Sequence, residues 1–129
     1  MSDFLLDTHV FLWWQWNDAH LGKVARATII EPANRIFVSA ASIWEIALKA
    51  RRGKLNFGSS PAAAISQNGF FERPVMAKEA EAAGELDWTH SDPFDRLLVA
   101  QAATGSLVFI TDDAAIRAFA GVVHLQASA

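Results

Sequence analysis

Three short segments of continuous hydrophobic sequence constrain the fold more than any other feature of the chain. Residues 4–6, 35–38 and 107–110 are hydrophobic throughout, apart from Arg35 at the edge of the second segment. A strand that is hydrophobic at every position has both faces buried, as in a parallel sheet between two layers of helices. Stretches with helical signals lie between these segments. The alternation therefore predicts an α/β fold with a central parallel sheet flanked by helices.

Start and stop signals divide the rest of the chain into helices and two weaker strands. Pro61 and the Asp92-Pro93 pair are typical helix starts, and Gly53 and Gly105 are typical helix ends. Helices are predicted over residues 10–16, 21–30, 39–51 or 42–51, 61–67, 77–86, 93–104 and 114–119, and weaker strands over 71–75 and 122–125. A chain of 129 residues with this pattern fits one compact domain, which we place at residues 1–129.

Composition limits the possible classes of protein. Hydrophobic residues make up 52% of the chain, which is enough for a core, and no hydrophobic run is long enough to span a bilayer. The chain has no cysteine, so disulfides and thiolate metal sites are excluded. The first residues do not resemble a secretory leader, and together with the absence of cysteine this favours a cytoplasmic location. Because the formal net charge is −3, any contact with nucleic acid depends on a local basic patch or on metal ions.

Acidic residues recur where the predicted strands end and where helices begin. In doubly wound parallel sheets, ligands bind beyond the carboxyl ends of the strands. Six acids lie at such junctions, namely Asp7, Glu45, Asp92, Asp95, Asp112 and Asp113. Clustered carboxylates repel one another unless a cation neutralises them, and oxygen ligands without cysteine favour Mg²⁺ or Mn²⁺. The pattern therefore indicates a candidate site for a divalent metal ion.

Two of these acids have unusually apolar neighbours. Asp7 lies between a hydrophobic strand and a hydrophobic helix, so we expect its side chain to point into a crevice. Glu45 is flanked by Trp44 and Ile46. A charge among such neighbours requires a partner, and a bound cation is one way to supply it.

Each acid also has an ordinary structural explanation. Asp7, Asp92 and Asp113 are suited to cap the helices that follow them. Glu45 can pair with Lys49, four residues further along the same helix. Taken one at a time, capping or pairing explains each acid better than metal binding does, and for Asp92 capping remains the better explanation. The recurrence of four acids in one alternating fold is what favours a metal site.

Four motifs contain these acids. The motifs are Leu5-Leu6-Asp7-Thr8-His9, Ser39-x-x-Ser42-x-Trp44-Glu45-Ile46, Asp92-Pro93-Phe94-Asp95-Arg96 and Ile110-Thr111-Asp112-Asp113. Together they resemble the motifs of the PIN-domain family and, most closely, those of VapC-type toxins of bacterial toxin–antitoxin pairs. They extend over residues 5–113, so the combination is more specific than any one motif.

The resemblance implies features that the pattern of residues does not. It implies a Rossmann-like fold, RNA as the substrate, a homodimer and inhibition by a cognate antitoxin. It implies that one acidic site for Mg²⁺ or Mn²⁺ is formed by Asp7, Glu45, Asp95 and Asp113. By motif register Asp92 is auxiliary at most, and the Thr-x-Asp spacing favours Asp113 over Asp112. Thr8 and Thr111 are expected to orient ligands or water by hydrogen bonds.

The expected reaction is endonucleolytic cleavage of RNA by a metal-activated water molecule, without a covalent nucleophile. Asp7 and Asp95 are the expected direct ligands, while Glu45 and Asp113 bind the ion directly or through water. His9 and His90 are expected to be packed, hydrogen-bonded residues rather than general bases.

One basic cluster has two explanations of equal weight. It consists of Lys49, Arg51, Arg52 and Lys54. It is either a solvated helix end, placed favourably for the helix dipole, or a rim that contacts RNA phosphates or an acidic partner segment.

Three tryptophans on one predicted helix, Trp13, Trp14 and Trp16, cannot all face a single core, because neighbouring side chains point apart. The exposed part of this surface is either a contact for a dimer or an antitoxin helix, or an aromatic group half-covered by the loop at residues 17–20.

Three other classes of protein compete with this interpretation. A haloacid-dehalogenase-type phosphatase needs a second aspartate two positions after Asp7, where His9 stands. A receiver-type signalling domain needs a lysine after a late strand, and Thr111-Asp112-Asp113 contains none. The third alternative is a non-catalytic partner-binding module of the same fold, against which the full set of four acids argues.

Overall fold

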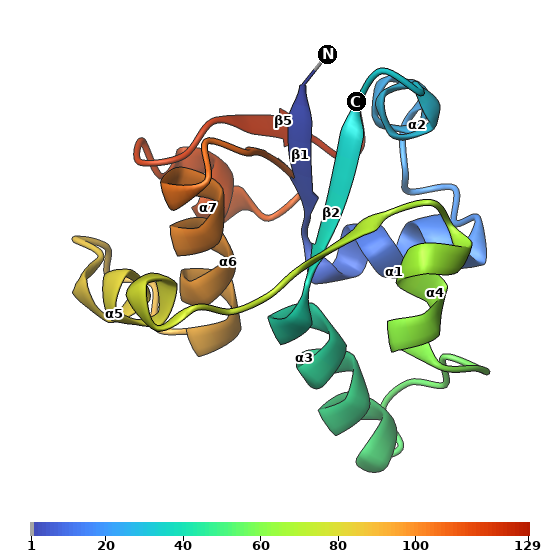
Figure 1. Ribbon diagram of the computed structural model, residues 1–129, viewed down its shortest axis with the longest axis horizontal. Helices are drawn as coiled ribbons and strands as arrows, with labels where there is room; N and C mark the ends of the chain where they lie inside the picture. The colour runs from blue at the N-terminus through green and yellow to red at the C-terminus, as the bar shows by residue number, and fades with distance from the viewer. Residues whose placement is uncertain (1) are drawn as a thin grey trace.

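The computed structural model describes residues 2–129, with a parallel sheet of five strands at its centre (Figure 1). The strands are β1 (Asp3–Leu6), β2 (Arg35–Ser39), β3 (Phe71–Arg73), β4 (Val108–Thr111) and β5 (His124–Gln126). Their order in the sheet is β3-β2-β1-β4-β5, and each strand runs parallel to its neighbours. This is the strand order of doubly wound, Rossmann-like sheets. The predicted α/β fold with a central parallel sheet is therefore confirmed.

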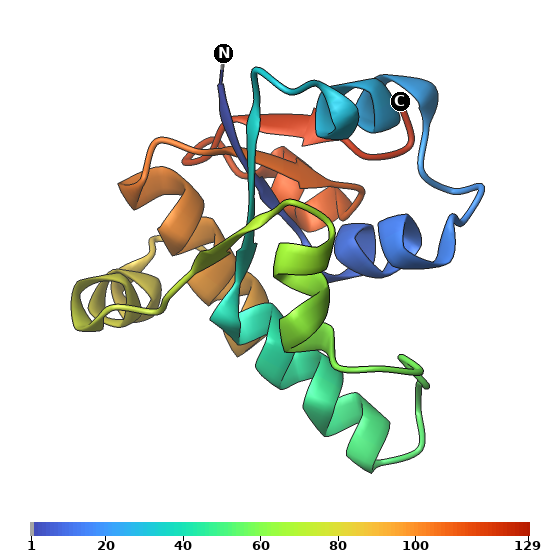
Figure 2. The ribbon, with the colours of Figure 1, turned by 45° about the vertical axis from the view of Figure 1, so that its right-hand side comes forward.

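Helices connect the strands and cover both faces of the sheet (Figures 1 and 2). They are α1 (Thr8–Trp16), α2 (Lys23–Ile30), α3 (Ala40–Arg51), α4 (Pro61–Gln67), α5 (Ala77–Glu85), α6 (Pro93–Thr104) and α7 (Ala114–Ala118). In Figure 1 α1, α2 and α4 lie on one side of the sheet, and α6 and α7 lie on the other. α3 extends away from the carboxyl edge of the sheet.

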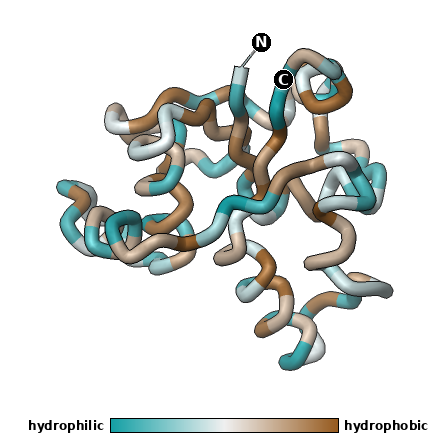
Figure 3. The backbone as a smooth tube through the Cα atoms, in the orientation of Figure 1, coloured by the Kyte–Doolittle hydropathy of each residue, from teal (hydrophilic) through white to brown (hydrophobic). Residues whose placement is uncertain are grey.

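Two separate cores result from this arrangement. Leu6 packs into the core beneath α1, α2 and α4, whereas Leu5 packs into the core beneath α6 and α7. Successive side chains of a strand point to opposite faces, so a strand between two helical layers must be hydrophobic at consecutive positions. The hydrophobic colouring of the central strands and the alternating hydrophilic and hydrophobic colouring of α5 are visible in Figure 3.

The ends of several elements have identifiable local causes. The Ser39 hydroxyl accepts a hydrogen bond from the backbone N–H of Ala41 at 3.0 Å, so Ser39 rather than Ser42 caps α3. β3 ends at Arg73, two residues earlier than predicted, because Pro74 has no N–H to donate to the sheet. The last strand lies at His124–Gln126 instead of residues 122–125, since its register is set by pairing with β4.

One buried carboxylate ties the segment after β3 to the rest of the fold. Glu79 in α5 accepts hydrogen bonds from Arg73 at 2.6 Å and from the side-chain amide of Gln101 in α6 at 3.2 Å. Gln101 is fully buried and also donates to the carbonyl of Pro74. These contacts hold α5 against α6, one end of which lies at the candidate site.

No helix within residues 2–129 is both long and apolar enough to cross a membrane.

Candidate functional site

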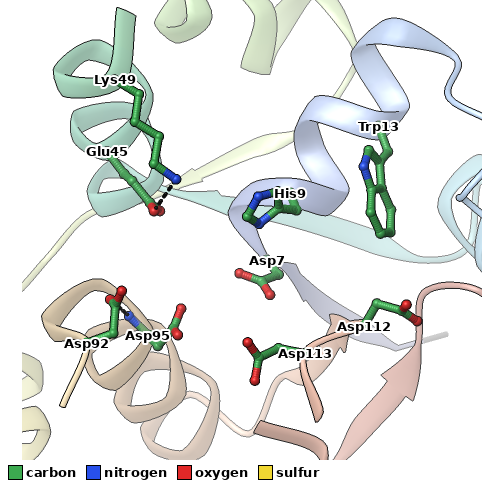
Figure 4. Close-up of a pocket in the computed structure, with 9 residues that line it drawn as sticks. All are labelled: Asp7, His9, Trp13, Glu45, Lys49, Asp92, Asp95, Asp112 and Asp113. Atoms are coloured by element: carbon green, nitrogen blue, oxygen red, sulfur yellow. Dashed lines mark hydrogen bonds and ion pairs between the residues drawn. The ribbon is translucent and has the colours of Figure 1, made fainter. Parts of the chain in front are cut away.

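The candidate site lies at the carboxyl ends of β1 and β4. These strands are neighbours, and the order of the strands along the chain reverses between them, which is where sheets of this type bind ligands. A pocket of about 430 Å³ opens there among residues of α1, α3 and α6 and of the segments that precede α1, α6 and α7. The side chains that line it are Asp7, His9, Trp13, Glu45, Lys49, Asp92, Asp95, Asp112 and Asp113 (Figure 4). The fold thus brings all six of the junction acids to one pocket.

Asp7 is the buried acid of this pocket, with 6% of its surface exposed. Its Oδ1 accepts a hydrogen bond from the backbone N–H of Thr8 at 2.8 Å, and its Oδ2 accepts one from the hydroxyl of Thr111 at 2.7 Å. Burial raises the pKa of Asp7 from 3.8 to about 7, helped by the negative charges of Asp95 and Asp113 and opposed by the two hydrogen bonds. Asp7 is therefore held in one orientation at a real electrostatic cost.

Buried hydroxyl groups hold the ends of the strands in place around Asp7. The Thr111 hydroxyl, besides donating to Asp7, accepts a hydrogen bond from the backbone N–H of Asp113 at 3.1 Å. The Thr8 hydroxyl donates to that of Ser42 at 2.9 Å, which links α1 to α3. Thr111 and Ser42 are fully buried. Of the two threonines expected to orient groups in the site, Thr111 contacts an acidic side chain through its hydroxyl, whereas Thr8 contacts Asp7 through its backbone.

Asp113 and Asp112 point in different directions after β4. Asp113 caps α7, since its Oδ1 accepts from the backbone N–H of Ile116 at 3.0 Å, and its charge acts on Asp7 and Asp95. Asp112 instead accepts a hydrogen bond from the backbone N–H of Ser128 at 3.0 Å. The hydrogen bonds from Ser128 lower the pKa of Asp112. Figure 4 shows Asp113 beneath Asp7 and Asp112 at the edge of the pocket.

Asp95 lies in the first turn of α6, and two neighbours define its position. Asp92 caps this helix by accepting from the backbone N–H of Asp95 at 3.0 Å. His90 donates through Nε2 to Oδ2 of Asp95 at 2.7 Å, and its ring stacks on Trp88 at a centroid distance of 4.6 Å. Burial raises the pKa of Asp95, and the charges of Asp92 and Asp113 raise it further, while His90 lowers it. His90 is thus a hydrogen-bonded, packed residue, as expected, and its partner is a candidate ligand.

Glu45 faces the pocket from α3 and has a basic partner there. Its Oε2 lies 3.1 Å from Nζ of Lys49, one turn further along the helix. The side chains are 13% and 34% exposed respectively, so both are partly removed from water. The i,i+4 pair expected as the ordinary explanation of Glu45 is therefore present, although it lies inside the pocket rather than on a solvated face.

The carboxylates share one pocket without being gathered around one point. Within residues 2–129, no group of three or more His, Asp or Glu side chains is arranged closely enough to hold a metal ion. The donor chemistry nevertheless fits a hard divalent cation, because all the acidic donors are oxygens and mutual repulsion contributes to the raised pKa values of Asp7 and Asp95. An ion shared by three of these acids would require side-chain movement into the pocket.

Two residues of the pocket differ from what the sequence led us to expect: Trp13 was not expected there, and His9, expected to be packed, is exposed. Trp13 and His9 line it beside Asp7, and the Trp13 ring stacks on His20 at 5.4 Å. In the sequence, only their spacing of four residues on one helix indicates that residues 9 and 13 lie on the same side of the pocket. Trp16 is 45% exposed, which confirms that the three tryptophans do not face a single core. Of the basic cluster, Lys49 alone lines the pocket, and its other members, Arg51, Arg52 and Lys54, are exposed.

Comparisons with known proteins support the resemblance of the motifs. The family model of the PIN domain matches residues 4–122. Ribonuclease VapC22 of Mycobacterium tuberculosis strain H37Rv is 29% identical over 120 residues, which cover 91% of this chain and 92% of that protein. A crystal structure of VapBC2 from Rickettsia felis, bound to a DNA fragment from its promoter, contains a chain with a TM-score of 0.66. That chain is 15% identical, the match covers 96% of this chain and 98% of that one, and it supports the fold alone.

Proposed function

The chain belongs to the PIN-domain family, and on that premise we propose that it is a metal-dependent endoribonuclease, the VapC-type toxin of a toxin–antitoxin pair. Residues 1–129 constitute its PIN domain in this proposal. The observation that carries it is the buried carboxylate of Asp7, whose pKa is raised to about 7 in a pocket that it shares with Glu45, Asp95 and Asp113. A charge kept in such surroundings is typical of a functional site.

The same four acids are the proposed ligands for Mg²⁺ or Mn²⁺. Asp113 and Asp95 each have one oxygen engaged, by Ile116 N–H and by His90 respectively, so the second oxygen of each is available to an ion. Asp7 is oriented by two hydrogen bonds, which limits the reorganisation needed for binding. Glu45 becomes available when Lys49 releases it.

When bound, the divalent ion supplies positive charge that lowers the pKa of water and shields the phosphate of the RNA. The residues of the chain have three further tasks. Thr111 holds Asp7 and the backbone of Asp113 in fixed relation. His90 holds one oxygen of Asp95. Glu45 or Asp113 accepts the proton from the attacking water, since each is a carboxylate that lines the pocket.

The proposed partners are RNA, a cognate antitoxin and a second copy of the chain, without attachment to a membrane, in the cytoplasm. The name of the relative from Mycobacterium tuberculosis supports the ribonuclease activity. The VapBC2 structure is named as a toxin–antitoxin complex and supports the partner by analogy of fold. Exposed hydrophobic side chains such as Trp16 and Trp44 are available for these contacts.

One observation favours a second candidate, a non-catalytic partner-binding module of the same fold. No three acidic or histidine side chains of the described residues converge tightly enough to hold an ion. In this alternative the acids serve mainly as helix caps and ion-pair partners, and the protein acts by binding a partner.

Cleavage of RNA by the purified chain distinguishes the two candidates. We expect cleavage of a single-stranded fluorogenic oligoribonucleotide in Mg²⁺ or Mn²⁺, none with a chelator, and a loss of about a hundredfold or more in Asp7→Asn. Asp87→Asn makes the same chemical change at an exposed position outside the pocket and is the matched control. Metal-independent cleavage, or full activity of Asp7→Asn, would exclude the proposed mechanism.

A further inference from the structure

Lys49 is the single lysine or arginine among the described residues that line the pocket of six carboxylates. Its side chain runs back along α3 so that Nζ is 3.1 Å from Oε2 of Glu45 (Figure 4). A lysine near the end of a surface helix can extend into water, yet this side chain is only 34% exposed. Its neighbours in the basic cluster, Arg51 and Arg52, are exposed and do not line the pocket. Among the described residues, Lys49 is therefore the one lysine or arginine whose flexible side chain can neutralise negative charge in the pocket.

The ammonium group and a divalent ion compete for the same acid. Nζ contacts one oxygen of Glu45, and a divalent ion on the other oxygen would lie close to the ammonium group in a partly buried pocket, where the two cations repel each other. Asp7, Asp95 and Asp113 have no lysine or arginine partner in the pocket, so no protein cation has to leave them before an ion binds. Glu45 must first release Lys49.

The ammonium group of Lys49, once released from Glu45, can pair with a negatively charged phosphate of the ligand. Lys49 is attached to α3 at the mouth of the pocket, and its flexible arm keeps Nζ close to any ligand that enters. A phosphate of RNA that approaches the acidic site brings negative charge to this place, and lysine binds phosphate as a point charge. The exchange leaves the charges of Lys49 and Glu45 paired in both states.

We propose that Lys49 is an exchangeable counter-cation of the acidic pocket, which neutralises Glu45 without a divalent ion and transfers to the RNA phosphate when one is bound. This inference rests on the proposed ribonuclease function. It gives one residue two effects of opposite sign: Lys49 weakens the binding of the metal ion and strengthens the binding of RNA. A residue that merely stabilised α3 would affect both in the same direction.

The first effect is tested by measuring Mn²⁺ binding in the absence of RNA. Electron paramagnetic resonance monitors this binding through the loss of the signal of the free ion. We expect Lys49→Met to bind Mn²⁺ about 2- to 5-fold more tightly than the wild type, the range of a partly exposed ion pair. Lys49→Arg keeps the charge and should bind within about twofold of wild type. Lys78→Met makes the same change at an exposed site on α5 and controls for net charge. Lys49→Gln is a second neutral variant if Lys49→Met does not fold.

Cleavage of the same oligoribonucleotide at saturating Mn²⁺ tests the second effect. We expect kcat/KM to fall about tenfold in Lys49→Met and to be largely restored in Lys49→Arg. If the wild type binds no Mn²⁺, the proposed function itself fails. If the wild type binds Mn²⁺ and Lys49→Met binds it no more tightly, the counter-cation role is refuted while the function stands. Tighter Mn²⁺ binding with unchanged cleavage would refute the transfer to phosphate.

Discussion

The buried charge of Asp7 should make the protein less stable as the pH rises, and Asp7→Asn should remove this effect. The pKa of Asp7 is raised in the folded state, so the folded protein holds a proton that the unfolded chain has already lost. Stability therefore falls as the pH rises through the interval between the two pKa values, 3.8 and about 7. Below that interval the carboxyl group of Asp7 is protonated in both the folded and the unfolded state, so it does not lower the stability of the protein.

The size of the effect follows from the two pKa values. Each tenfold change in proton affinity corresponds to about 1.4 kcal/mol, so a rise from 3.8 to about 7 costs about 4 kcal/mol at pH 8. Asparagine at position 7 keeps an acceptor for Thr8 N–H and carries no charge to bury. Asp7→Asn should consequently be more stable than wild type at pH 8 by up to about 4 kcal/mol, and close to wild type at pH 4.

Urea denaturation of both proteins between pH 4 and pH 8.5, in the presence of a chelator, measures this difference. Asp112→Asn is a matched control of opposite sign, since hydrogen bonds from Ser128 lower the pKa of Asp112 and its charge therefore stabilises the folded state above pH 4. Addition of Mg²⁺ should stabilise the wild type and not Asp7→Asn. A stability difference between Asp7→Asn and wild type that does not change with pH would refute the reasoning.

Two further substitutions test contacts around the site and at the end of the chain. Thr111→Val removes the donor to Asp7, so the free energy of unfolding should fall by about 1–3 kcal/mol and the pKa of Asp7, followed by carbon-13 NMR of its carboxyl group, should rise further. Thr111→Ser, which keeps the hydroxyl, should restore both, and an unchanged pKa in Thr111→Val would contradict the role assigned to this hydrogen bond. A Cβ on Gly22 would overlap the carbonyl oxygen of Ala129, so Gly22→Ala should lower stability to urea by about 1–3 kcal/mol through displacement of the segment after β5. Gly84→Ala, where a Cβ meets nothing within 4 Å, should not be destabilising, and equal behaviour of the two glycine variants would count against this packing.

Much of the fold could be predicted because its signals are local. The hydrophobic runs at residues 4–6 and 107–110 identify strands buried on both faces, and Pro61 and the Asp92-Pro93 pair identify helix starts. The order of the strands could be predicted only through the resemblance of the motifs, because pairing of β1 with β4 joins segments about a hundred residues apart. Spacing along the chain carries no signal for such a pair.

The gathering of the acids in one pocket could be predicted, but the partners of each acid could not. Glu45 and Lys49 are four residues apart on a helix, so their contact follows from helical geometry, while its place inside the pocket follows from the orientation of α3. The contact of His90 with Asp95 depends on the path of an irregular loop, for which no periodic signal exists. The position of a residue within a helix or strand is thus encoded by the local sequence. The direction in which its side chain points is set by tertiary packing.

Helix capping and membership of the acidic pocket are not alternatives for these residues. A capping carboxylate gives one oxygen to a backbone N–H and presents the other to its surroundings, as Asp113 does at the start of α7. Asp7 and Asp92 cap α1 and α6 at the same edge of the sheet, so the positive ends of these helices face the pocket. Their N–H groups partly offset the repulsion among the acids, which allows the chain to fold before any cation arrives. Burial is the main cause of the raised pKa values of Asp7 and Asp95, and repulsion by neighbouring carboxylates adds to it; a divalent ion can relieve this repulsion on binding.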